Sequence, residues 1–110
     1  MITIRIKDDF SATPGHRCPE DGPFSGEEFL EKVLRPRYVE AVAQKEKIFV
    51  DLDGTSGYGT SFLEASFGGL AREFEIKDVL DKFDFQSAAE PYLPDEITGY
   101  IREARDEKKR

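Results

Sequence analysis

The clearest hydrophobic pattern lies in the middle of the chain, between residues 47 and 74. It begins with a short run of β-forming apolar residues: Ile48, Phe49, Val50 and Leu52. Such a run, closed by Gly54, is typical of a buried strand. Gly57 and Gly59 come next, and their conformational freedom predicts a loop that turns sharply after the strand.

An amphipathic stretch follows this glycine loop. Ser61 and Glu64 have the spacing of a capping box, so a helix is expected to begin at Ser61. Apolar residues then recur at steps of four, three and four positions, which is a helical face: Leu63, Phe67, Leu70 and Phe74. The pattern predicts a strand, a glycine loop and a helix. The loop then lies beyond the carboxyl end of the strand, where open α/β sheets usually bind ligands.

The segment before this unit carries a strand pattern and an irregular connection. Ile2, Ile4 and Ile6 alternate with polar residues, which predicts a half-buried strand at a sheet edge or in an antiparallel position. Residues 9–24 are rich in proline and glycine. This connection exceeds the usual length, so we expect it to be either functional or partly disordered.

Helix signals precede and follow the central unit. Ser25 and Glu28 form a second capping box, with Phe24 and Phe29 at the positions of a hydrophobic staple. Pro36 is expected to end or bend that helix. A helical face then resumes at four residues: Tyr38, Val39, Val42 and Ala43. Nearer the C-terminus we predict a helix over residues 77–82, a strand over 83–87 and a last helix whose first residue is Pro94.

The order of the predicted elements is β, loop, α, β, α, β, α. We therefore predict a single domain over residues 1–110 with a small α/β layer fold, in which helices pack on a mixed sheet of about four strands.

Charge and cysteine content narrow the functional classes. The 110-residue chain has a formal net charge of −7, which disfavours nucleic acid as the main ligand, because that binding depends on Lys and Arg. The single cysteine, Cys18, permits no internal disulfide and fits a reducing compartment. The charged N-terminus is unlike a signal peptide, and no stretch approaches the length of a membrane span. We expect a cytoplasmic protein with no membrane or nucleic-acid partner.

The central segment, FVDLDG followed by GYGTSFLEASFGGL, resembles the STAS-like domain family, a group of short bacterial domains related in outline to anti-sigma-factor antagonists. The most specific part is residues 60–64 with Phe67 and Gly68. The resemblance implies a STAS-like fold and a regulatory binding domain rather than an enzyme. In antagonists of this type, a kinase of the histidine-kinase ATPase fold phosphorylates a hydroxyl at the start of a helix. That acceptor corresponds to Thr60, with Ser61 beside it. The chain differs from the pattern at Gly59, where an aspartate is expected, and at Phe62, where a glycine is expected.

The residues themselves are compatible with such a switch. A helix N-terminus favours a phosphate, whereas Asp53 and Glu64 would repel it, so the two effects nearly balance. The alternative is that Ser61 serves only as a helix cap. The candidate surface for a partner or a phosphate comprises Arg17, Asp53, Gly57, Tyr58, Gly59, Thr60, Ser61 and Glu64.

Two members of this surface have further expected contacts. Arg17 is expected to pair with Asp51, Asp53 or a bound phosphate, or simply to lie at the surface as most arginines do. Tyr58, between glycines, is expected to be an exposed contact residue; the alternative is a ring folded back onto the sheet.

Two other functions compete with this interpretation. The segment FVDLDGT, with Asp51 and Asp53 two residues apart, also matches the nucleophile motif of haloacid-dehalogenase-like phosphatases, in which Mg²⁺ assists. However, that fold begins with this strand and is longer than the remaining chain.

The turn at residues 57–61 could instead bind a nucleotide or other anion without chemistry. His16 and Cys18 are too few for a zinc site, so we expect no metal, no cofactor and no catalytic residue.

Overall fold

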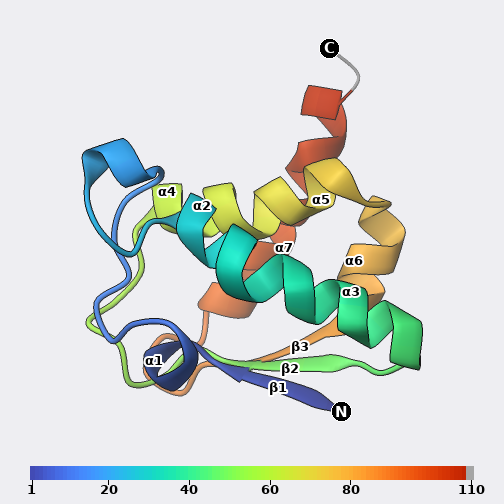
Figure 1. The fold of residues 1–110 in the computed structure, drawn as a ribbon, viewed down its shortest axis with the longest axis horizontal. Helices are drawn as coiled ribbons and strands as arrows, with labels where there is room; N and C mark the ends of the chain where they lie inside the picture. The colour runs from blue at the N-terminus through green and yellow to red at the C-terminus, as the bar shows by residue number, and fades with distance from the viewer. Residues whose placement is uncertain (109–110) are drawn as a thin grey trace.

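The three strands of the protein form one parallel sheet. The computed structural model describes residues 1–108 (Figure 1). The strands are β1 (Ile2–Arg5), β2 (Ile48–Asp51) and β3 (Phe83–Gln86), in the order β1-β2-β3. Ile2, Ile48 and Phe83 lie opposite one another in the register.

This sheet differs from the predicted mixed sheet of about four strands. The described chain forms three strands, and all of them are parallel. Each connection between strands contains helices, and a connection of that kind joins parallel neighbours. The edge position predicted for the N-terminal strand is confirmed, while the antiparallel alternative is wrong. The strand is also shorter than predicted, because Ile6 begins a short helix, α1 (Ile6–Asp9).

The longer helices lie on one face of the sheet (Figure 1). Right-handed crossovers between strands that are added in sequence order all fall on the same side. The alternation along the strands agrees with this arrangement, since Ile4, Ile48 and Val50 are fully buried beneath the helices. The neighbouring positions on the strands are mostly polar, as expected for a face without helices: Thr3, Arg5, Asp51, Asp84 and Gln86, with Phe49 half-buried among them.

The first crossover is one continuous helical segment, made of α2 (Gly26–Phe29), the π-helical turn η2 (Leu30–Leu34) and α3 (Arg35–Gln44). The predicted cap is confirmed, because Ser25 Oγ accepts a hydrogen bond from the backbone N–H of Glu28 at 3.1 Å. Pro36 does not end the helix. The wide π turn comes immediately before it, and such a turn accommodates a residue that lacks an N–H and crowds the preceding turn.

The second crossover starts with another continuous helical segment: α4 (Thr60–Leu63), the π-helical turn η3 (Glu64–Gly68) and α5 (Gly69–Glu73). It packs tightly on the first segment, because a β-carbon on Gly69 would lie 2.8 Å from Leu30 Cδ2. The glycine at position 69 is what allows this close approach. The core between these segments is largely aromatic: Phe29, Phe62 and Phe67 are fully buried, and their rings are in contact.

The C-terminal part follows the prediction closely. Helix α6 (Ile76–Lys82) runs directly into β3, and α7 (Leu93–Lys108) closes the core. Pro94 is the second rather than the first residue of α7. Within the described chain, no helix is both long enough and apolar enough to cross a membrane.

The long connection between α1 and α2 is tied to the rest of the fold. It contains a short 3-10 helix, η1 (Pro19–Asp21). The carbonyl of His16 accepts from Gly26 N at 2.7 Å, and that of Arg17 accepts from Glu27 N at 3.0 Å. The carbonyl of Ala12 accepts from Ser56 N at 2.8 Å. These bonds place the connection beside the glycine loop that follows β2.

Candidate functional site

The loop between β2 and α4 is shaped by two glycines and two side-chain turns. Gly54 has a φ of +90° and Gly57 a φ of +124°, and both angles strongly favour glycine. Asp51 Oδ1 accepts from the N–H of Asp53 at 3.0 Å, and Thr55 Oγ1 accepts from that of Gly57 at 3.2 Å. The loop therefore has a defined conformation at the carboxyl end of the central strand.

Thr60 and Ser61 lie at the surface where this loop ends. Both residues are exposed, and neither hydroxyl has a hydrogen-bond partner among residues 1–108. The prediction that Ser61 caps the helix is wrong, because the helix begins one residue earlier, at Thr60. Gly59 occupies the cap position, and no side chain caps the helix. A cap is absent because Gly59 has no side-chain oxygen to offer.

The other long helical segment before β2 begins very differently. Its first N–H groups are satisfied by the carbonyls of His16 and Arg17 and by the hydroxyl of Ser25. The start of α2 is thus closed by the chain itself. Of these two helix starts, the one at Thr60 is the one that carries free side-chain hydroxyls.

Tyr58 is half-buried rather than exposed, so the alternative of a ring folded back onto the protein is the correct one. Its hydroxyl donates to the carbonyl of Leu52 at 2.7 Å, and its ring lies 6.0 Å from that of Phe62. Burial of the ring raises the pKa of Tyr58 to about 12. Tyr58 therefore stabilises the loop from its buried side, through Leu52 and Phe62, and offers little of its surface to a partner.

Arg17 lies at this surface but pairs with Glu64 instead of the predicted Asp51 or Asp53. Glu64 also accepts a 2.6 Å bond from Arg72, and its side chain is 22% exposed. Burial alone would raise the pKa of Glu64, but the bonds and charges of Arg72 and Arg17 outweigh it and lower the pKa. Two guanidinium groups surround one carboxylate, so Glu64 would repel a nearby phosphate less than the sequence suggested.

Asp53 turns away from the candidate surface and holds another loop. Its carboxylate accepts from Ala88 N at 2.9 Å and from Ala89 N at 3.1 Å, both in the connection between β3 and α7. These backbone hydrogen bonds lower the pKa of Asp53. The residue joins the ends of two neighbouring strands, a role that the sequence did not indicate.

This geometry predicts an acid-sensitive contribution of Asp53 to stability. The carboxyl pKa is lowered in the folded state, so the contribution is complete above the unfolded pKa of about 3.9 and is lost as the pH falls through the folded pKa. We expect Asp53→Asn to have a lower unfolding midpoint than the wild-type protein at pH 7. The difference between the two midpoints should shrink between about pH 4 and pH 2. Thermal unfolding followed by circular dichroism at several pH values measures this.

The matched control is Asp81→Asn, since Asp81 is an exposed carboxylate without an ion pair within residues 1–108. This variant should have the same unfolding midpoint as the wild-type protein at every pH. If the difference in unfolding midpoint between the wild-type protein and Asp53→Asn stays constant down to pH 2, the stabilising role assigned to the Asp53 carboxylate is wrong.

The carboxyl end of the sheet also contains a small polar hollow of about 320 Å³. It is lined by Arg5, Lys7, Asp8, Asp51, Asp53 and Gly54. This is where the phosphatase motif lies, but Asp51 and Asp53 both accept backbone hydrogen bonds there. Among residues 1–108, no group of three or more Asp, Glu, His or Cys side chains is arranged to hold a metal ion.

Cys18 lies in the connection beside Arg17 and is not activated. Its thiol donates to Asp21 Oδ2 at 3.1 Å. Hydrogen bonds with Asp21 and Glu20, together with their negative charges, raise the pKa of Cys18 to about 11. The thiol is therefore poorly suited to act as a nucleophile.

The groove between α3 and α6 was not predicted from the sequence. The predicted apolar face after Pro36 included Val39 and Val42, but these residues are 51% and 50% exposed. They border a groove between α3 and α6, at the end of the molecule away from the glycine loop (Figure 1). The only signal in the sequence was a helical face wider than one stripe.

Comparison with known families identifies the chain. The family described as "STAS-like domain of unknown function (DUF4325)" matches residues 25–93, which is more than half of the 110-residue chain. The chain belongs to this family. No curated protein and no solved structure matches it. The resemblance noted in the sequence is confirmed, and the matched part of this STAS-like domain extends from the cap of α2 to the start of α7.

Proposed function

We propose that this STAS-like domain is a regulatory module that works by binding another protein and not by catalysis. The contact surface is formed by the glycine loop, residues 54–59, and the first helical turn, Thr60–Glu64. The observation that carries the proposal is the pair of exposed hydroxyls on Thr60 and Ser61, which form no hydrogen bond within the described chain. Polar groups without a structural task at the end of a central strand are available to a partner.

The switch that we propose is phosphorylation of Thr60 or Ser61. Both side chains lie in the first turn of a helix, where free N–H groups and the helix dipole favour an anion. Ser61 is three residues before Glu64, so the two share one helix face. Arg17 pairs with Glu64 on that face, and a phosphate on Ser61 could attract the same arginine. Phosphorylation would then change both the charge and the arrangement of the surface.

The partner that we propose is a kinase or regulator with the histidine-kinase ATPase fold, as the resemblance to anti-sigma-factor antagonists implies. A cytoplasmic location fits such a partner. The test is to mix the purified domain with an ATPase-fold kinase encoded beside it and ATP, and to map phosphate by mass spectrometry. We expect phosphate on Thr60 or Ser61, and its loss in Thr60→Ala combined with Ser61→Ala.

Ser56→Ala is the matched control, because Ser56 is an exposed hydroxyl in the same loop. This variant should be phosphorylated like the wild-type protein. Phosphate that persists in the double variant would contradict the assignment to these hydroxyls. Absence of any complex in a sedimentation experiment with the same kinase would contradict the proposed partner.

The phosphatase alternative has weaker support. Asp51 and Asp53 would need free carboxylates to attack phosphorus and to transfer protons, yet both accept hydrogen bonds that shape loops. Hydrolysis of an aryl phosphate with Mg²⁺ that disappears in Asp51→Asn would favour the enzyme. A thermal shift with nucleotides or inorganic phosphate would favour the third possibility, an anion-binding turn at residues 57–61.

A further inference from the structure

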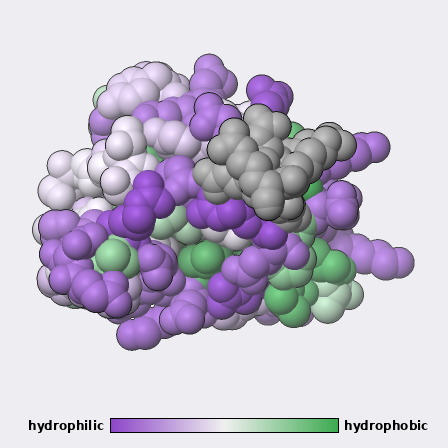
Figure 2. Space-filling view, turned by 90° about the horizontal axis from the view of Figure 1, so that it is seen from above, coloured by the Kyte–Doolittle hydropathy of each residue, from purple (hydrophilic) through white to green (hydrophobic). Residues whose placement is uncertain are grey.

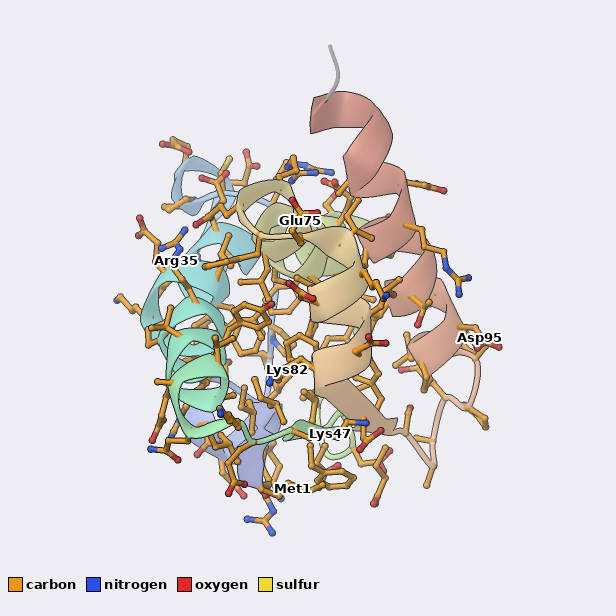
Figure 3. The ribbon with its side chains drawn as sticks, turned by 90° about the vertical axis from the view of Figure 1, so that its right-hand side faces the viewer. Met1, Arg35, Lys47, Glu75, Lys82 and Asp95 are labelled. Atoms are coloured by element: carbon orange, nitrogen blue, oxygen red, sulfur yellow. The ribbon has the colours of Figure 1, made fainter. Side chains whose placement is uncertain are left out.

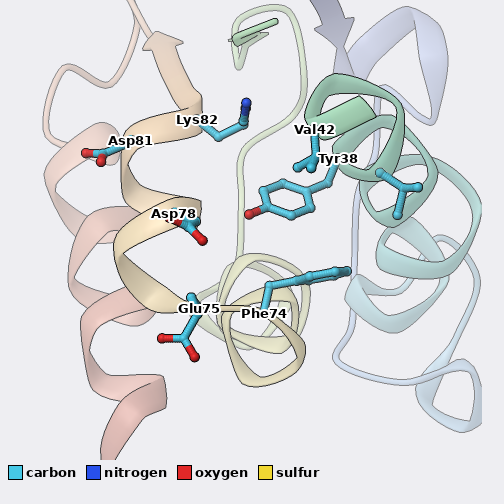
Figure 4. Close-up of a pocket in the computed structure, with 8 residues that line it drawn as sticks. Tyr38, Val42, Phe74, Glu75, Asp78, Asp81 and Lys82 are labelled. Carbon is cyan, nitrogen blue, oxygen red and sulfur yellow. The ribbon is translucent and has the colours of Figure 1, made fainter. Parts of the chain in front are cut away.

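A second surface lies between α3 and α6. It is a groove of about 500 Å³, and Figure 4 shows the two helices on either side of it. The rings of Tyr38 and Phe74 form its floor, with centroids 4.7 Å apart. The full lining is Tyr38, Val39, Val42, Phe74, Glu75, Asp78, Asp81 and Lys82.

The wall on α3 is apolar. Val39 and Val42 are three positions apart, so they share one stripe of the helix, and each is about half exposed. Figure 2 shows apolar side chains gathered at the right-hand side of the molecule, the end that α3 and α6 occupy in Figure 1. Single exposed apolar residues are common on proteins. These two border a hollow with an aromatic floor, which is the composition of a binding groove.

The wall on α6 is acidic. Glu75, Asp78 and Asp81 recur every three positions along this wall, and Lys82 is the one cation in the lining. None of the three carboxylates forms an ion pair with another residue of the described chain. Nearby Glu73, in contrast, is paired with Arg35 at 2.6 Å. Figure 3 views the molecule from this end, with Arg35 on one side and Glu75 at the start of α6.

Tyr38 connects the two walls. Its residue is almost fully buried, and Figure 4 shows its hydroxyl directed across the groove towards Asp78. The ring is thus part of both the core and the groove lining. The groove's charge is negative on one side and its surface apolar on the other.

We propose that this groove binds a basic amphipathic helix of a partner protein. Apolar side chains of that helix would lie against Val39, Val42 and the aromatic floor, as in other helix-in-groove complexes. Lysines or arginines on its flank would face the acidic wall of α6, where complementary charge favours association and orients the ligand. Helix α4, which begins at Thr60, lies at the other end of the molecule from α6 and the end of α3 that lines the groove (Figure 1), so this inference does not depend on the proposed function.

The test uses two synthetic helical peptides of about four turns, roughly 15 residues. Both carry leucines on one face, and they differ only in lysines or glutamates along the flank. We expect the lysine peptide to bind the isotope-labelled protein saturably, with amide shifts centred on Val39, Val42 and Asp78. The glutamate peptide should not bind. Val42→Asp should weaken the lysine peptide at least about tenfold, because it places an unpaired charge in the apolar contact.

Two charge variants make a matched pair. Asp78→Asn with Asp81→Asn should weaken the lysine peptide about three- to tenfold and reduce its salt dependence. Glu27→Gln with Glu31→Gln removes the same charge from exposed positions outside the groove and should have no comparable effect. Phosphorylation at Thr60 or Ser61 serves as a separate readout and should be unchanged in these two double variants and in Val42→Asp.

Three results would overturn the proposal. The first is no saturable binding of the lysine peptide. The second is equal binding of both peptides, or shifts that map to residues 54–61. The third is a concentration-dependent dimer that Val42→Asp dissociates in sedimentation, which would assign the groove to a second copy of the chain.

Discussion

Replacing Gly26 with alanine is expected to lower the free energy of unfolding by about 3 kcal/mol. A β-carbon at this position would lie 2.5 Å from the carbonyl oxygen of Phe62 and 2.9 Å from Ala65 Cβ. Both are parts of the neighbouring helical segment that cannot rotate away, so the two segments would have to separate. Urea unfolding followed by circular dichroism gives the loss directly, and the melting temperature should fall by roughly 10–20 °C.

Gly99→Ala is the matched control for this prediction. Gly99 also lies in a helix, α7, but a β-carbon there would meet nothing within 4 Å. Alanine is the better helix former, so this variant should gain about 0.5–1 kcal/mol. A stability of Gly26→Ala equal to that of the wild-type protein would show that the helical segments do not pack as closely as the structure describes.

Features with a local cause were predictable from the sequence. The cap formed by Ser25 and Glu28 needs only residues that are three apart, and it is present. The helix and strand predicted over residues 77–87 are present as α6 and β3, because their apolar periods are local. The family resemblance likewise depended on a short central segment, and the comparison confirms it.

Features that depend on distant partners were not predictable. The parallel order of three strands depends on which segments pair, and no local pattern encodes that choice. Asp53 is held by Ala88, and Arg17 by Glu64, across 35 and 47 residues of chain. The sequence places Asp53 after a strand and Arg17 in a long connection, but it does not say which residues they will contact.

The exposed side of α3 at the groove also depends on a distant element and was not predictable from the sequence. The periodicity after Pro36 included both Tyr38 and Val42, and both were predicted to lie on one helical face. Only Tyr38 enters the core, whereas Val42 remains half exposed at the groove. The position of α6, which is set by β3 at the sheet edge, decides how much of α3 is covered.

The largest single effect on stability is expected for Phe62→Ala. Phe62 is fully buried, and its ring lies 5.7 Å from Phe29, 6.0 Å from Tyr58 and 6.2 Å from Phe10. Truncation removes this contact area and leaves a cavity, which costs about 3–5 kcal/mol for a buried phenylalanine. This is a large part of the 5–15 kcal/mol that is typical of small domains. Urea unfolding measures the loss, and Phe62→Leu should recover most of it.

The matched control for Phe62→Ala is Ser61→Ala, at the preceding residue. Ser61 is exposed and its hydroxyl forms no hydrogen bond in the described chain, so its removal should change the free energy of unfolding by less than about 0.5 kcal/mol. A loss close to that of Phe62→Ala would mean that the hydroxyl has a structural role and would contradict its assignment to a partner surface. The two neighbouring residues therefore separate folding from function. Phe62 holds the first turn of α4 against the core through its ring contacts with Phe10, Phe29 and Tyr58. Thr60 and Ser61 remain available on its outer side, so their substitution tests binding without a loss of the fold.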